Sequence, residues 1–234
     1  MTHKTFFAAI TAFVASFIFG ADVSANDGAY QVVSPDGHLS ATVVVGSDIS
    51  YTVSRDALQL IAPSQISMTL SDGIVFGQDD KVRKVRRDSR DQVWQATVYK
   101  KSDVRDHYNE MTLEFKEFSL TFRAYDDGVA YRFASKLKGD FTVMSEKAEF
   151  AFAKDWDAFI PYVKQHTKTL ETQYFNSFEN TYKEHRLSEW NKSRLAFAPL
   201  VVNADNGVKV LLTEADLLDY PGMFLYNEGD ASAL

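Results

Sequence analysis

Alternation of apolar and polar residues is the dominant pattern along this chain. Phe118, Leu120 and Phe122 alternate with polar residues, and residues 129–133 show the same period. A period of two puts every second side chain on one face of a strand, so both segments are predicted to be half-buried β-strands. Asp127-Gly128 lies between them, and such a pair suits a type I′ turn, whose central residues need positive φ. The pattern therefore predicts a β-hairpin.

The same turn chemistry recurs elsewhere in the chain. Asp36-Gly37, Asp72-Gly73 and Asn206-Gly207 are further pairs of this kind, and the last leads into the apolar run Val208–Leu212. Several such turns indicate antiparallel sheets. We therefore predict an all-β fold, a large antiparallel β-sandwich with few short helices.

Helical periodicity is scarce. The best candidate is Ser177–Lys192, where the apolar residues fall at uneven, partly helical spacing, and we interpret it as a loop-rich insertion. No repeat of fixed period and no Pro/Gly/Ser-rich linker marks an internal boundary. The sequence therefore predicts a single domain after the first residues.

The first residues have the pattern of an export signal. His3 and Lys4 precede an apolar run over Phe6–Phe19, and Val23-Ser24-Ala25 offers a cleavage site, with Phe19-Gly20-Ala21 as its competitor. The run is shorter than the roughly 20 residues that span a bilayer, so we expect no membrane anchor.

These features predict a signal peptide over residues 1–25 and a mature domain over residues 26–234. The chain has no cysteine, so its core must hold it without disulfides, and a lipid-bearing cysteine is excluded. With 45% hydrophobic residues, the mature part is long enough for one large core. The expected location is periplasmic or secreted.

Charge excludes nucleic acid as a partner. The formal net charge is −7, whereas a phosphate backbone requires a strongly basic footprint. The one basic run, Lys81–Arg87, alternates with valines and is predicted to be a solvated strand or loop face.

Catalytic and metal motifs are absent from the sequence. It contains no G-x-S-x-G elbow and no H-E-x-x-H helix, and its five histidines show no paired spacing. Asn203–Glu214 imitates an EF-hand loop, but Gly207 falls at the fifth position of that stretch instead of the sixth. The chain has 32 acidic residues, but spacing alone cannot place two of them at the separation that a glycosidase needs. We therefore assign no catalytic residue and no cofactor-binding residue.

Five phrases, taken in order, carry a resemblance to a known family. They are Ser34-Pro35-Asp36-Gly37, Arg105–Glu110, Arg123–Phe133, the segment Trp156–Pro161, and Thr213–Met223. Together they resemble the amino-terminal domain of glycoside hydrolase family 97, and the last phrase is the most specific. The resemblance spans roughly Val33–Leu225, although Phe175–Asn191 looks unlike the usual family pattern.

The resemblance implies a supersandwich-like β-domain that precedes a catalytic (β/α)₈ barrel and a small β domain. Such enzymes act on α-linked glucosides or galactosides, and their active site holds calcium. The catalytic carboxylates lie in the barrel, and this chain ends before a barrel would begin. The resemblance therefore implies a non-catalytic domain that shapes the active site, and we expect this chain alone to be inactive.

One functional residue carries over from the family, namely Glu214. It matches a glutamate that ligates calcium, and a carboxylate suits this hard cation, which takes 6–8 oxygens. The alternative is that Glu214 caps a short turn or helix that begins at Thr213.

Other candidates have structural explanations. His107, Asn109 and Glu110 could form a polar cluster between sheets, and Trp156 could be a buried core residue that offers no face to a sugar. Two further readings of the whole chain stay open, a stand-alone carbohydrate-binding module and an independent enzyme such as a lyase.

Overall fold

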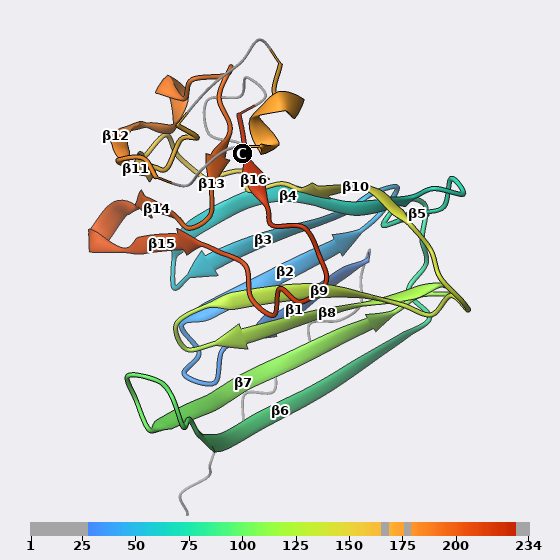
Figure 1. Cartoon of the computed structure of the whole chain (residues 1–234). Coiled ribbons are helices and arrows are strands. Elements are labelled where there is room, and N and C mark those ends of the chain that lie inside the picture. The colour runs from blue at the N-terminus through green and yellow to red at the C-terminus, as the bar shows by residue number, and fades with distance from the viewer. Residues whose placement is uncertain (1–27, 165–168, 176–178, 228–234) are drawn as a thin grey trace, which may run out of the picture.

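The computed structural model describes residues 28–164, 169–175 and 179–227, and β-strands dominate this part of the chain (Figure 1). Its helices are three short 3₁₀ segments, η1 (Glu171–Tyr174), η2 (Leu187–Glu189) and η3 (Asp205–Gly207). No helix in these residues is long and apolar enough to cross a membrane. The predicted all-β class is confirmed, whereas the predicted signal peptide lies outside the described residues.

The first large sheet has six strands in the order β1-β2-β3-β4-β10, with β5 paired to β4. All of its pairs are antiparallel. Its strands are β1 (Ala29–Val33), β2 (Leu39–Val45), β3 (Ile49–Arg55), β4 (Leu58–Leu70), β5 (Val75–Phe76) and β10 (Val143–Ala148).

The second large sheet is an antiparallel meander of four strands in the order β6-β7-β8-β9. Its strands are β6 (Lys84–Gln95), β7 (Asp103–Glu114), β8 (Phe118–Tyr125) and β9 (Val129–Ser135). The residues of β8 alternate strictly between buried and half-buried, which confirms the pattern predicted from residues 118–122.

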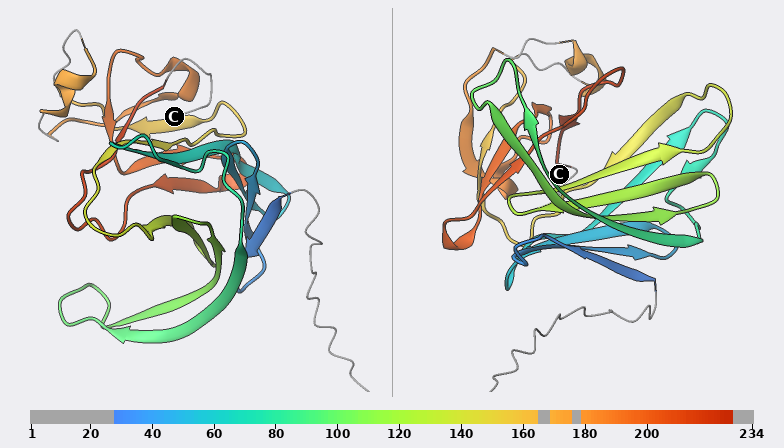
Figure 2. Two further views of the ribbon diagram at one scale, coloured as in Figure 1. Left: turned by 90° about the vertical axis from the view of Figure 1, so that its right-hand side faces the viewer. Right: turned by 90° about the horizontal axis from the view of Figure 1, so that it is seen from below.

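The two large sheets pack face to face as curved layers, and the β6–β9 sheet turns its other face toward the open side of the molecule (Figure 2, left). Aliphatic and aromatic side chains fill the interior, where Tyr51 of β3 lies 5.8 Å from Phe122 of β8 between ring centroids. The side-chain amide of Asn109 in β7 also donates to the carbonyl oxygen of Val33 in β1 at 2.8 Å. Apolar burial and this polar contact together fix how the layers stack.

A third sheet lies at the upper left of Figure 1 and has the order β12-β11-β14-β15. Its strands are β11 (Asp157–Ile160), β12 (Lys183–Arg186), β14 (Leu200–Asn203) and β15 (Lys209–Leu212), and the short pair β13 (Ala196–Phe197) with β16 (Phe224–Leu225) adjoins it. Its apolar residues belong to the same core cluster as those of the large sheets, and that cluster extends from Val32 to Leu225.

Two of the predicted turns differ in detail. Asn206 (φ 57°) and Gly207 (φ 75°) both have positive φ, and the N–H of Val208 donates to Asp205 at 3.1 Å, as a type I′ turn requires. The hairpin between β8 and β9 also forms, but Gly128 has no positive φ. The Tyr125 N–H donates to the Gly128 carbonyl at 2.7 Å, so Gly128 already belongs to the ladder and Asp126 and Asp127 make the turn.

The segment Ser177–Lys192 contains more regular structure than a loop-rich insertion. Residues 179–182 are irregular, but Lys183–Arg186 forms β12 and pairs with β11 at the edge of the third sheet. Ser177 and Phe178 lie outside the described residues. The basic run Lys81–Arg87 is mostly exposed and enters β6, which confirms the predicted solvated face.

Candidate functional site

Residues 213–223, here called the strap, connect β15 to β16 and cross the open mouth of the sandwich (Figure 1). β9 and β10 are the outermost strands of their sheets on this side. Asp216 of the strap lies 3.7 Å from the guanidinium of Arg132 in β9, and the Tyr220 hydroxyl donates to Glu146 of β10 at 3.0 Å. The strap therefore bridges two sheet edges that do not pair with each other.

Glu214 lies at the start of the strap and is half-buried. Its Oε2 accepts the backbone N–H of Met223 at 2.8 Å, which ties the beginning of the strap to its end. Within the described residues no helix begins at Thr213, so Glu214 is not a helix cap. The other carboxylate oxygen, Oε1, accepts no hydrogen bond from the described part of the chain, which leaves it available to a further partner.

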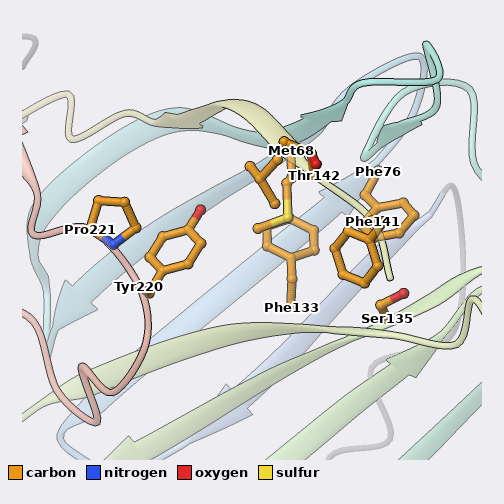
Figure 3. A pocket seen from close by; sticks show the side chains of 9 residues that line it. Met68, Phe76, Phe133, Ser135, Phe141, Thr142, Tyr220 and Pro221 are labelled. Carbon is orange, nitrogen blue, oxygen red and sulfur yellow. The ribbon is translucent and has the colours of Figure 1, made fainter. Parts of the chain in front are cut away.

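A pocket of about 490 Å³ opens beside the strap (Figure 3). Tyr220 and Pro221 of the strap form one wall, and residues of β4, β5, β9 and the start of β10 form the rest. The lining is mainly apolar, and its polar groups are hydroxyls; the residues are Met68, Phe76, Phe133, Ser135, Phe141, Thr142, Val143, Tyr220 and Pro221. Such a lining can bind apolar groups or sugar faces but provides no acid and base for hydrolysis.

Two tyrosines near this mouth resist ionisation. Burial, and then the nearby Glu146 carboxylate, raise the pKa of Tyr220 to about 12. Burial, Glu146 and Tyr220 also raise the pKa of Tyr131 on β9. Tyr220 therefore stays a hydrogen-bond donor to Glu146 across the neutral range.

Of His107, Asn109 and Glu110, which were expected to form a polar cluster between the sheets, only Asn109 joins the two sheets. His107 Nδ1 lies 3.2 Å from an Asp126 carboxylate oxygen, and Arg123 Nε donates to Glu110 at 2.7 Å. Asn109 joins the two sheets, as described above. His107 and Glu110 each contact one charged side chain, so the three residues do not form a single cluster.

Trp156 is a core residue with 6% of its surface exposed. Its indole N–H donates to Asp205 at 3.0 Å, and Lys154 contacts the other oxygen of that carboxylate at 2.5 Å. Lys154 and Trp156 lower the pKa of Asp205. The ring therefore anchors the turn between β14 and β15 and offers no face to a sugar.

Metal-binding side chains do not cluster in the described residues. No group of three or more His, Asp or Glu residues there could hold an ion. The stretch Asn203–Glu214, which resembles an EF-hand loop in sequence, contains the type I′ turn and β15. Any ion bound at Glu214 would thus need oxygens from elsewhere.

Sequence reasoning singled out Glu214 but missed the residues that position the strap. Arg132 and Glu146 reach the strap only through the tertiary fold, since Glu146 and its partner Tyr220 are 74 residues apart. No short-range spacing signals that contact.

The curved antiparallel layers and the strap across their edges define a large β-sandwich domain, whose candidate site is Glu214 of the strap with the pocket beside Tyr220. The sequence model described as "Glycosyl-hydrolase 97 N-terminal" matches residues 32–233. The chain belongs to this family and corresponds to its amino-terminal domain.

A curated relative is the retaining alpha-galactosidase of Bacteroides thetaiotaomicron, with 43% identity over 207 residues. The match covers 88% of this chain but 31% of the relative, so the chain spans about a third of that enzyme's length.

Solved structures agree on the fold. A family 97 enzyme from Pseudoalteromonas sp. strain K8, in complex with panose, superposes with a TM-score of 0.73 at 25% identity and covers 87% of this chain and 31% of its own. A beta-arabinopyranosidase superposes with a TM-score of 0.60 at 19% identity, over 88% of this chain and 38% of its own, and shares the fold.

Proposed function

We propose that this chain is the non-catalytic amino-terminal domain of an exported α-glycosidase. In the intact enzyme it packs on a (β/α)₈ catalytic barrel, shapes one wall of the active site and supplies one calcium ligand. The substrates are α-linked glucosides or galactosides. The domain alone hydrolyses no glycoside, because the two carboxylates of such chemistry belong to the barrel.

Family membership over residues 32–233 is the observation that carries this proposal. The curated relative is named a retaining alpha-galactosidase, and the Pseudoalteromonas enzymes were solved with panose and with acarbose. Because this chain matches only about a third of their length, the remainder is the expected location of the catalytic groups.

The geometry of Glu214 fits a calcium ligand. Calcium takes 6–8 oxygens at once, and carboxylate oxygens are its usual protein ligands. Oε2 is held by the Met223 N–H, which orients the carboxylate and leaves Oε1 for an ion. The scarcity of neighbouring acids in the described residues supports a shared site, in which the barrel completes the shell.

The signal-peptide pattern of residues 1–25 supports export to the periplasm or beyond. Cleavage near Asn26 would leave the mature domain of residues 26–234.

The test uses two proteins, this chain and a fusion in which it replaces the matched third of the Bacteroides enzyme. Calorimetry should find calcium binding to the chain alone no tighter than on the order of 10⁻³ M. In the fusion, Glu214→Gln should lower calcium affinity and turnover of an aryl α-galactoside by at least about tenfold, since even a residue behind a metal ligand is worth that much. Glu184→Gln, an exposed acid on β12, is the matched control.

Two results would count against the proposal. Micromolar calcium binding by the chain alone would show a self-contained site. Equal calcium dependence in the Glu214→Gln and Glu184→Gln fusions would reduce Glu214 to a residue that only ties the strap together.

A further inference from the structure

Two exposed apolar segments lie far apart in the sequence. The first is the arm, residues 91–107, where β6 and β7 continue beyond β8. The last β7–β8 pair is Tyr108 with Tyr125, whereas β6–β7 pairing continues to Gln95 with Asp103. Trp94 and Tyr99 of the arm are 57% and 69% exposed. The second segment is the strap, where Leu217 is exposed and Leu218 is 79% exposed.

Both segments lie on the same side of the molecule. In the two views of Figure 2, the green loop at the arm's end and the red strap project toward one side, on either side of the open face of the β6–β9 sheet. Trp94 belongs to that face. It pairs with Val104 of β7, whose side chain lies on the same face of the strand as Tyr108 and on the opposite face from the core residue Met111.

The exposure of the arm needs a physical reason. A two-stranded ribbon without a third strand or a covering element is at best marginally stable in water. Exposed aromatic and leucine side chains that gather on one side mark interaction surfaces, and tryptophan and tyrosine are the usual anchors of such surfaces.

Several charged side chains on the face between the two segments already have partners within the domain. The Arg123 guanidinium lies 4.3 Å from the Tyr108 ring centroid and pairs with Glu110 at 2.7 Å. Glu114 is paired with Arg86 and Lys136. Because these five side chains have charged partners within the domain, covering this part of the face does not leave them unpaired.

We propose that the arm and the strap are the two contact points of one docking face, and that its occupant is the part of the family 97 polypeptide outside the matched third. The proposal rests on the proposed function. The match leaves about two thirds of the relative's length unaccounted for, and it ends shortly after the strap, so the following polypeptide begins close to this face in sequence. The strap also carries Glu214, whose missing calcium ligands we place in the same occupant.

A first experiment uses this chain alone with the dye 1-anilinonaphthalene-8-sulfonate. Trp94→Ser with Leu218→Ser should remove about half or more of the dye fluorescence, because exposed apolar patches bind such probes. Val44→Ser is the control, since Val44 is exposed on the outer face of β2. Urea denaturation should show that all three substitutions leave the fold intact, as expected for exposed positions.

A second experiment compares hydrogen exchange in this chain with that in the fusion to the Bacteroides enzyme. Amides of residues 93–99 and 213–220 should exchange about tenfold more slowly in the fusion, while those of Leu39–Val45 should not change. A fusion that turns over substrate without this protection would overturn the docking face and leave the proposed function standing. A fusion with neither activity nor protection would overturn both.

Two outcomes on the chain alone also refute the docking face. A monomer whose dye binding is the same in the double variant and in Val44→Ser would show that the arm and strap form no apolar surface. Concentration-dependent dimers that protect the same amides would make a second copy of this chain the occupant and overturn the assignment.

Discussion

Replacing Phe118 with alanine should be among the most damaging single changes in this domain. Phe118 is fully buried, and its ring stacks on Phe115 at 4.4 Å and on Phe76 at 4.7 Å between centroids. Phe133 makes a third ring contact at 5.6 Å. The side chain thus joins the β6–β9 sheet to β5 of the first large sheet.

The structure places the loss near the upper end of the usual range. Phe→Ala in a core costs about 3–5 kcal/mol, depending on how far the surroundings collapse into the cavity. Phe76 is buried in β5, and Phe115 is buried in the β7–β8 turn with its N–H bonded to Phe118, so neither ring is free to move in and fill the space. We therefore expect a loss of about 4–5 kcal/mol, which already includes the aromatic contacts.

Urea denaturation followed by tryptophan fluorescence measures this loss as a shift in midpoint at constant slope. Val44→Ala, at an exposed site on β2, should change the free energy of unfolding by no more than about 0.5 kcal/mol. A loss below about 2 kcal/mol for Phe118→Ala would refute the rigid aromatic stack, because only a collapsed cavity gives so small a value.

Two further predictions concern the strap and the turns. The phenol of Tyr220 has a pKa raised to about 12, so the stability that comes from keeping it protonated is present below pH 10 and is lost as the pH rises through 12. Between pH 9 and about pH 12, the free energy of unfolding should fall less in Tyr220→Phe than in the unaltered protein. Because Tyr220 is partly exposed, the difference should be under about 1 kcal/mol, measured by urea denaturation at both pH values. An identical fall in both proteins would contradict this. Gly207→Ala should destabilise by about 1 kcal/mol because φ is positive there, whereas Gly128→Ala should be neutral or slightly stabilising, and equal effects would show that the two turns do not differ as described.

The sequence was informative where local chemistry decides the structure. Alternation in Phe118–Phe122 reports which side chains face the core, and Asn206-Gly207 reports positive φ, because both signals arise within a few residues. The strand Lys183–Arg186 was not predicted as a strand, since its residues are polar and exposed and it owes its conformation to pairing with β11. At Asp127-Gly128 the turn was placed correctly, but the register of the ladder, which no dipeptide encodes, moved Gly128 out of it.

The candidate site was predictable only in part. Glu214 was identified because it lies in the short segment Thr213–Met223, whose sequence resembles that of the family. The hydrogen bond from the Met223 N–H to Glu214 was not predicted. The contacts of Asp216 with Arg132 and of Tyr220 with Glu146 were not predicted either, because they join the strap to strands of two different sheets. Such contacts depend on the layer geometry and leave no trace in spacing.

The pairing of β10 with β4 also orders events during synthesis. Residues Ile66–Leu70 of β4 pair with β10, which begins at Val143. While the chain emerges from its amino end, this edge of β4 stays bare until more than half of the domain has been made, and a bare edge is a template for other chains. Any shortened version that ends before Val143 would keep that edge open permanently and should aggregate.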